Sequence, residues 1–299
     1  MTSADGLGVA GVKVGHWTDS RSETGCTVVE FPAGTVASYE ARGGAPASRE
    51  VELLHPDKAV ASIDAVLLTG GSAFGLAAAD GVMRYYEELG RGVQTSAGTV
   101  PIIPTLALFD LGVGDPAVRP GAEHGYLAAR ATGKAQALSG RVGAGAGAYV
   151  SHWRGPSGRH AAGLVSHVAR LGALAVGALC AVNAFGDIDQ GTGAISFDAI
   201  QGLTPPFDFP GGRMHTTIGV VCTNGRFDKA ACQVIAQGAH DGLARAISPP
   251  HTRFDGDAFI AAATGEVDAH IDVARFLALT AVCQAIRSLP GAEQVKGLG

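Results

Sequence analysis

Short segments in which apolar and polar residues alternate, or in which apolar residues follow one another without a break, are spread along the whole chain. Both patterns are typical of β-strands, half-buried in the first case and fully buried in the second. They predict strands at residues 12–17, 26–31, 34–42, 64–68, 174–182, 216–223 and 259–263. Residues 100–108 are also apolar, but Pro101 and Pro104 interrupt them, so neither strand nor helix is favoured there.

Other segments carry apolar residues every three or four positions, which is the spacing of an amphipathic helix. The longest covers residues 72–89, and one face of it would carry Leu76, Ala79, Met83 and Tyr86. Ser72 is placed to cap this helix, and Asp228 to cap another that runs to residue 247. Two more helices are expected at residues 122–132 and 273–289. Because strands and helices interleave, the pattern predicts α/β layers around a single core.

The composition suits a tightly packed molecule. Hydrophobic residues make up 46% of the chain and charged residues only 16%, which predicts a compact core and a homo-oligomer. The 44 glycines among 299 residues are about twice the usual share of roughly 7%. Since they follow no fixed period, collagen is excluded, and tight turns and close backbone contacts explain them better.

Charge and cysteine usage narrow the class of partner and the compartment. The net charge of −5 is scattered, with no basic run, so nucleic acid is not favoured as a partner. Five widely spaced cysteines without a CxxC pair favour free buried thiols in a reducing cytoplasm over disulfides or zinc. No signal peptide is recognisable, and the longest apolar stretch, residues 171–182, is shorter than the ~20 residues that span a bilayer. The ten histidines show no metal-binding spacing, and neither a metal nor another cofactor is expected.

The most informative stretch is Met214-His215-Thr216-Thr217-Ile218, where a glycine-rich connection, residues 187–212, leads into a strand. A cut between His215 and Thr216 would leave a hydroxyl and an α-amine on one residue. That amine, with a pKa of ~8, can take the hydroxyl proton and so act as the base for its own nucleophile. The alternative is that the two threonines only favour a β-strand, and spacing alone prefers this alternative.

A pair of carboxylates and one amide are further candidates. Asp255 and Asp257 flank Gly256 before a predicted strand, a spacing that puts both side chains on one face. Such a pair can hold a hydroxyl and an ammonium group by charge-assisted hydrogen bonds, although Asp-Gly is also common in turns and spacing alone prefers a turn. Asn183, at a strand end, can point an amide N–H at a developing oxyanion, but an asparagine completing a turn is the simpler explanation.

Two glycine clusters are candidate ligand sites. Gly70-Gly71-Ser72 follows a strand and precedes a helix, where backbone N–H groups can hold an anion. Phe74 breaks the match to GxSxG, and residues 143–148 lack the strand–turn–helix setting of a dinucleotide fingerprint. Residues 143–148 are expected to form a loop, or a strand that another backbone approaches closely. Both clusters are interpreted as close-packing segments, with substrate contact as the lesser alternative.

Six motifs follow one another over nearly the whole chain. They are Ala41-Arg42-Gly43-Gly44, Leu68-Thr69-Gly70-Gly71-Ser72-Ala73-Phe74-Gly75-Leu76, Val142-Gly143-Ala144-Gly145, Val182-Asn183, Thr216-Thr217-Ile218, and His251-Thr252 through Asp255-Gly256-Asp257. In this order they resemble the P1 peptidase family, S58, with its L-aminopeptidase D-esterase/amidases, β-aminopeptidases and nylon-oligomer hydrolases. The resemblance reverses the preference stated above for Thr216 and for the aspartate pair.

The resemblance implies a four-layer αββα fold of the N-terminal-nucleophile type, related to ornithine acetyltransferase, made as a precursor that cuts itself once. The products would be an α chain, residues 1–215, and a β chain, residues 216–299, within a homotetramer of αβ units. Thr216 matches the family nucleophile, Asp255 and Asp257 the pair that orients it, and Asn183 the asparagine on the oxyanion side. The implied activity is that of an aminopeptidase or amidase, cleaving small peptide, amide or ester substrates through an acyl-enzyme.

Three positions depart from the family pattern. His152 stands where the family often has lysine, and as a substitute it would make proton handling depend on pH around 6–7. His215 precedes the expected cut, where relatives often have asparagine or glycine. Phe74 lacks the hydroxyl of the tyrosine in nylon-hydrolase relatives, so a hydrogen bond to substrate would be missing. His152, Phe74 and Ser72 are the candidate substrate-binding residues.

The sequence is compatible with three other functions. An acyltransferase on the same fold would pass the acyl group to an amine instead of water. A catalytically silent scaffold or binding homologue would keep the fold and lose the chemistry, and the departures at His152 and His215 leave room for it. A nucleotide-binding α/β protein is the least supported, because no proper glycine fingerprint is present.

Overall fold

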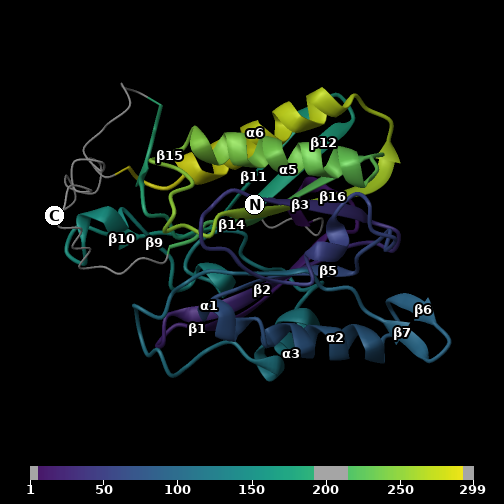
Figure 1. Ribbon diagram of the computed structural model, residues 1–299, viewed down its shortest axis with the longest axis horizontal. Coiled ribbons are helices and arrows are strands. Elements are labelled where there is room, and N and C mark those ends of the chain that lie inside the picture. The colour runs from purple at the N-terminus through teal and green to yellow at the C-terminus, as the bar shows by residue number, and fades with distance from the viewer. Residues whose placement is uncertain (1–5, 192–214, 292–299) are drawn as a thin grey trace.

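The seven predicted strands and three others form two five-stranded sheets that lie face to face, with helices outside each of them (Figure 1). This computed structural model describes residues 6–191 and 215–291. Figure 1 shows α5 and α6 over one sheet and α2 and α3 over the other. The layers therefore run helices, sheet, sheet, helices, which confirms the expected four-layer αββα fold.

The first sheet has the spatial order β1 (Lys13–Asp19), β2 (Thr24–Glu30), β5 (Ala65–Thr69), β8 (Thr105–Ala107) and β4 (Ala47–Arg49). The second has the order β11 (Gly163–Leu171), β12 (Leu174–Val182), β14 (Ile218–Gly225), β16 (Ala258–Val267) and β3 (Val36–Ala41). Every segment predicted as a strand contributes one, and β12 has the predicted bounds. Its nine residues are all buried, as an unbroken apolar run in a central strand requires.

A central core fills the space between the two sheets. Val29 and Leu68 from the first sheet meet Val220 and Ile260 from the second, and all four are fully buried. Removing one such side chain from water stabilises the fold by about 1.5–3 kcal/mol. Two further cores lie outside the sheets, one between each sheet and its own helices.

The four covering helices are α2 (Ala78–Glu88), α3 (Ala122–Arg130), α5 (Lys229–Ala244) and α6 (Ile271–Arg287). The side chain of Asp228 accepts a hydrogen bond from the amide of Ala231, so the predicted cap of α5 is confirmed, although this helix ends three residues before position 247. Helices α5 and α6 pack closely because α5 presents glycine to its partner. A Cβ at Gly242 would lie 2.4 Å from the carbonyl oxygen of Leu279.

Short elements complete the described chain. The strands are β6 (Val93–Thr95), β7 (Gly98–Val100), β9 (Tyr149–Val150), β10 (His160–Ala161), β13 (Asp187–Ile188) and β15 (Ile247–Ser248). The 3₁₀ turns are η1 (Gly6–Gly8), η2 (Glu52–Leu54), η3 (Gly143–Gly145) and η4 (His152–Arg154). The undecided residues 100–108 thus hold the end of β7 and all of β8, while most of the predicted connection 187–212 lies outside the described residues.

The single helix predicted for residues 72–89 is wrong, because the chain forms α1 (Ser72–Gly75) and then α2. The break follows Gly75, where a Cβ would lie 1.8 Å from the carbonyl oxygen of Gly70. Ser72 does not cap the helix either. It lies inside α1 with a left-handed φ of 53°, and Gly71 is the cap residue without any side-chain bond.

The second glycine cluster is a 3₁₀ turn, η3, and not a strand. The close backbone approach predicted for it is confirmed, since a Cβ at Gly145 would lie 2.1 Å from the amide nitrogen of Leu164.

Strand register decides which loops meet. β14 and β16 are parallel neighbours with Ile218 beside Ala258, and β3 runs antiparallel on the other side with Ala41 beside Ala258. The residues just before β14, just before β16 and just after β3 therefore lie at one end of the second sheet. These are the segments that contain Thr216, the aspartate pair and Gly43.

All five cysteines are buried and free, as their spacing predicted. Within residues 6–191 and 215–291, no helix combines the length and apolar character needed to cross a membrane.

Candidate active site

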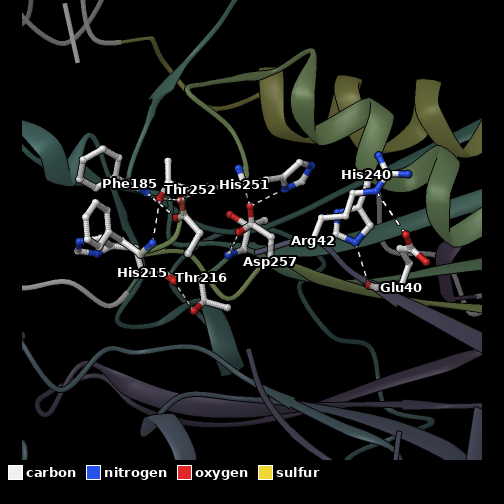
Figure 2. A network of polar contacts seen from close by, with 12 residues as sticks. Glu40, Arg42, Phe185, His215, Thr216, His240, His251, Thr252 and Asp257 are labelled. Carbon is white, nitrogen blue, oxygen red and sulfur yellow. Dashed lines mark hydrogen bonds and ion pairs between the residues drawn. The ribbon is translucent and has the colours of Figure 1, made fainter. Parts of the chain in front are cut away.

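Thr216 lies directly before β14 in a buried position, 4% exposed. Its backbone nitrogen donates to the carbonyl oxygen of Asn183, 2.6 Å away. Its hydroxyl donates to the carbonyl oxygen of His215, the residue before it in the chain (Figure 2). In the uncut chain the candidate nucleophile therefore rests on the peptide group that precedes it.

His215 is held in an extended pairing with the segment that carries the aspartates. Its amide donates to the carbonyl oxygen of Phe254, and its own carbonyl oxygen accepts from the amide of Gly256, each at 2.8 Å. A Cβ at Gly256 would lie 2.8 Å from the Thr216 hydroxyl oxygen, so the threonine side chain lies against the residue between the two aspartates. The carbonyl group of His215 thus receives a backbone and a hydroxyl hydrogen bond together.

Asp257 fixes the backbone next to the nucleophile. One of its carboxylate oxygens accepts from the amide of Thr217 at 2.8 Å. The other accepts from Nδ1 of His251 at 2.9 Å and from the His251 amide at 3.3 Å (Figure 2). His251 has a left-handed φ of 52°, which turns its ring and its amide toward one oxygen.

Asp255 is equally buried, with 2% exposure. It accepts hydrogen bonds from the amide of Phe185 at 3.0 Å and from the amide and hydroxyl of Thr252 at 3.1 and 2.5 Å. Burial raises the pKa of Asp255 to about 7, and the charge of Asp257 adds to this effect. The structure therefore brings the predicted carboxylates together in one dry environment, where they hold the backbone and Thr252.

The loop after β3 packs against the backbone of the aspartate segment, residues 255–257, just before β16. Gly43 packs on the aspartate segment so tightly that a Cβ would lie 2.3 Å from the Asp257 nitrogen and 2.4 Å from the Asp255 carbonyl oxygen. The amide of Gly43 donates to Asp257 and that of Ala45 to Asp255, in both cases to the backbone oxygen. Only glycine leaves room for this contact.

Asn183 directly follows β12, and its backbone carbonyl oxygen accepts from the amide of Thr216. Its side-chain oxygen accepts from the Tyr149 amide and from Nε2 of His152, both at 3.1 Å. Its side-chain nitrogen donates to the carbonyl oxygen of Phe109 at 2.9 Å. In the uncut chain the His215 carbonyl oxygen accepts from the Gly256 amide and the Thr216 hydroxyl, and a role of Asn183 at the oxyanion stays a prediction.

His152 lies beside His215, the residue that precedes the candidate nucleophile Thr216. Its ring stacks on that of His215 with centroids 3.9 Å apart. Burial lowers the pKa of His152 to about 4, so the ring is neutral at pH 6–7. The expectation that this histidine titrates around pH 6–7 is therefore wrong, because a buried imidazole loses the hydration that would stabilise its charge.

Ser72 and Phe74 lie on α1. The amides of Gly71 and Ser72 donate to the Asp110 carboxylate and to the Leu108 carbonyl oxygen, at 2.7 and 2.9 Å. They are therefore not free to hold an anion. Phe74 is 60% exposed with Arg119 over its ring, and its contact with substrate stays a prediction.

Sequence patterns assigned no role to several residues of the site. His251 and Thr252, which belong to the sixth motif, hold the carboxylates, and Asp110 accepts from a glycine amide. Each lies in an irregular segment without periodicity. Behind His251, His240 donates through Nε2 to the carbonyl oxygen of Glu40 at 2.8 Å (Figure 2). Among the residues the structure describes, no group of three or more histidine, cysteine, aspartate or glutamate side chains is arranged to hold a metal ion.

Comparisons with known proteins show the family of the chain. The family model for peptidase family S58 matches residues 7–296. An uncharacterized aminopeptidase of Mycobacterium leprae is 43% identical over 290 residues, covering 87% of this chain and 78% of the relative. A 6-aminohexanoate-oligomer endohydrolase of a Kocuria species is 28% identical over 277 residues, covering 86% and 74%.

Solved structures show the same fold. A β-aminopeptidase of a Burkholderia species matches with a TM-score of 0.70 at 19% identity, covering 96% of this chain and 87% of that one. The L-aminopeptidase D-Ala-esterase/amidase of Ochrobactrum anthropi, described as a variant of the Ntn hydrolase fold, matches with a TM-score of 0.71 at 17% identity, covering 93% and 83%. The chain is a hydrolase and belongs to peptidase family S58.

Proposed function

We propose that this chain cuts itself between His215 and Thr216 and that Thr216 then hydrolyses small peptides, amides or esters as an aminopeptidase or amidase. The observation that supports this most is the Thr216 hydroxyl on the His215 carbonyl oxygen, which the Gly256 amide also holds. A nucleophile beside a polarised carbonyl is the arrangement that acyl transfer needs.

The first reaction is an acyl shift within the chain. The Thr216 oxygen attacks the His215 carbonyl carbon, and the C–N bond of that peptide breaks. The hydroxyl proton ends on the Thr216 nitrogen, which becomes an amine, and the His215 acyl group is left as an ester on the threonine. Water then hydrolyses this ester and releases the α chain, residues 1–215, from the β chain, residues 216–299.

The second reaction repeats the chemistry on substrate. The free Thr216 amine accepts the hydroxyl proton, and the oxygen attacks the substrate carbonyl to form an acyl-enzyme that water hydrolyses. The Gly256 amide stabilises the oxyanion, with Asn183 as a second candidate donor. Asp257 fixes the Thr217 backbone, and the buried carboxylates of Asp255 and Asp257 provide a negative environment for the new ammonium group.

Intact-mass measurement tests the first reaction. The purified protein should give two masses, corresponding to residues 1–215 and 216–299. Thr216→Ala should give one full-length mass and no activity, while the matched variant Thr216→Ser should still be cut. A wild-type chain that stays whole for days would contradict the proposal.

A panel of aminoacyl p-nitroanilides and esters tests the second reaction. Release of p-nitroaniline by the cut protein, absent in Thr216→Ala, is the expected result. Adding a competing amine separates hydrolysis from transfer, because a transferase would yield the new amide in place of the free acid.

The proposal includes a homo-oligomer of αβ units, a tetramer by resemblance, in the cytoplasm. Exposed Phe276 on α6 and Leu171 at the end of β11, 63% and 61% exposed, supply apolar surface for such contacts. Five free buried cysteines suit a reducing compartment. Light scattering coupled to gel filtration measures the assembly, and a monomeric mass would contradict it.

A further inference from the structure

The ring of His215 fills a narrow space next to the bond that is to be cut. One face lies on His152, with centroids 3.9 Å apart and planes 26° apart. The centroid of the Phe185 ring lies 5.8 Å from that of the His215 ring. Phe185 itself packs on Phe254, with ring centroids 5.5 Å apart. We call this space, bounded by His152 and by Phe185, which Phe254 supports, the ring slot. His215 is only 3% exposed within it.

The backbone of His215 is bound as an added strand beside the aspartate segment. Its amide donates to the Phe254 carbonyl oxygen, and its carbonyl oxygen accepts from the Gly256 amide. These are the two hydrogen bonds that any extended acyl residue would make at this edge. The ammonium group of an N-terminal residue placed in the same way would donate to the Phe254 carbonyl oxygen.

Self-cleavage and substrate cleavage place a carbonyl carbon against the same Thr216 oxygen. The residue before the cut therefore occupies the position of the residue whose carbonyl the mature enzyme attacks. Resting on the proposed function, we infer that the ring slot binds the side chain of the substrate's N-terminal residue after His215 has left it, and that it selects planar aromatic side chains.

The chemistry of the walls favours a flat, unsaturated ring. The His152 ring is fixed because Nε2 bonds to the side-chain oxygen of Asn183 at 3.1 Å. It offers a flat face at stacking distance, while Phe185 offers a tilted one. Stacked and edge-on ring pairs are attractive beyond the area they bury, which a saturated ring of the same size cannot match.

The test compares substrates that differ only in this side chain. Processed wild-type protein is assayed with the p-nitroanilides of phenylalanine, cyclohexylalanine and alanine. We expect kcat/KM for the phenylalanyl substrate to exceed that for the cyclohexylalanyl substrate by about fivefold, the size of one ring pair. Both ring substrates should be cleaved faster than the alanyl one.

A variant then assigns the preference to the slot. His152→Gln keeps a side-chain donor for Asn183 but removes the ring, and it should bring the phenylalanyl-to-cyclohexylalanyl ratio close to one. The matched control is His167→Gln at an exposed position on β11, which should keep the fivefold ratio. Intact mass confirms that each variant assayed has been cut. The phenylalanyl-to-cyclohexylalanyl ratio of the wild-type protein tests the ring preference even if a variant is not cut.

Failure of this inference differs from failure of the proposed function. A cut protein that hydrolyses the alanyl substrate but shows no ring preference, or keeps the preference in His152→Gln, overturns the ring slot alone. An uncut wild-type chain that releases no p-nitroaniline from any of the three overturns the proposed function and the slot with it.

Discussion

The amide nitrogen of Gly256 donates a hydrogen bond to the carbonyl oxygen of His215, 2.8 Å away. The donor therefore comes from the glycine between the two aspartates. The same glycine gives room to the nucleophile, since a Cβ there would lie 2.8 Å from the Thr216 hydroxyl oxygen and 2.5 Å from the Ala45 carbonyl oxygen. One residue thus polarises the bond to be cut and leaves space for the group that cuts it.

Gly256→Ala should slow self-cleavage by about 100-fold, the loss typical when an oxyanion donor is displaced. The added methyl group pushes either the Thr216 hydroxyl or the Gly256 amide away from the His215 carbonyl. Intact mass against time after purification measures the rate. Gly112→Ala, at an exposed position where the nearest atom to a Cβ is 3.8 Å away, is the control and should be cut normally. Normal cutting of Gly256→Ala would remove Gly256 from the mechanism.

His251 acts on the nucleophile only through Asp257, so its loss should change turnover more than binding. His251→Gly removes the ring donor without strain, because glycine accepts the left-handed φ of 52°. We expect kcat to fall about tenfold with KM within twofold, since the misplaced carboxylate no longer holds the Thr217 backbone. Steady-state kinetics with an aminoacyl p-nitroanilide measures both.

His251→Asn is the restoring variant, because asparagine tolerates the same backbone conformation and carries a side-chain N–H near the position of Nδ1. It should recover most of kcat. Equal losses in both variants, or a rise in KM alone, would show that His251 does not position Asp257.

How far the sequence predicts this molecule depends on the range of the interactions involved. An unbroken run of apolar residues is a local pattern, so the sequence predicts β12 with its bounds. The αββα layers follow from the resemblance to the family. The break after Gly75 was missed because the apolar spacing of residues 72–89 continues across it. At the break Gly75 packs against the Gly70 carbonyl oxygen, a contact that periodicity does not record.

The site itself is less local. Thr216, the aspartate pair and Gly43 meet only because β3, β14 and β16 are neighbours in one register, and spacing alone favoured a plain strand and a plain turn. The Gly256 amide is a backbone group, and the residue type at a position does not predict that its backbone N–H will act as such a donor. The neutrality of His152 comes from burial, so its titration could not be foreseen from its identity.

Asp110 connects the first glycine cluster to the site. Its carboxylate accepts from the Gly71 amide and the Thr24 hydroxyl, both at 2.7 Å, and Phe109 beside it accepts from Asn183. Asp110→Ala should lower the free energy of unfolding by about 2–3 kcal/mol, because it leaves a buried amide without a partner. Urea unfolding of the uncut Thr216→Ala protein measures this.

Asp110→Asn should lose less stability, because its amide oxygen can still accept from Gly71 and its nitrogen can donate to Thr24. Asp115→Ala, at an exposed position in the same loop region, is the control and should change the free energy of unfolding by no more than about 0.5 kcal/mol. A loss in Asp110→Ala no larger than in this control would contradict the assignment.

The pKa of Asp255 makes stability depend on pH in an unusual direction. Between pH 4 and 7 the folded chain keeps a proton on Asp255 that the unfolded chain releases, since burial raises this pKa to about 7. Stability from this group therefore falls as pH rises through this window and levels off above it. His152 and His240 act in the opposite sense, because burial lowers each pKa to about 4. The effect of Asp255 on the pH dependence of stability must therefore be measured as a difference between proteins with and without this carboxyl group.

In the uncut Thr216→Ala background, Asp255→Asn should therefore gain stability relative to its parent as pH rises from 5 to 7.5, because an amide releases no proton on unfolding. Urea unfolding at both pH values measures the difference, and Asp272→Asn, exposed in the first turn of α6, is the control. The cut wild-type protein should show a weaker dependence, since the new Thr216 ammonium group favours the ionised carboxylate and lowers its pKa. The same pH dependence with and without Asp255 would mean that this carboxyl is already ionised at pH 5 in the folded chain.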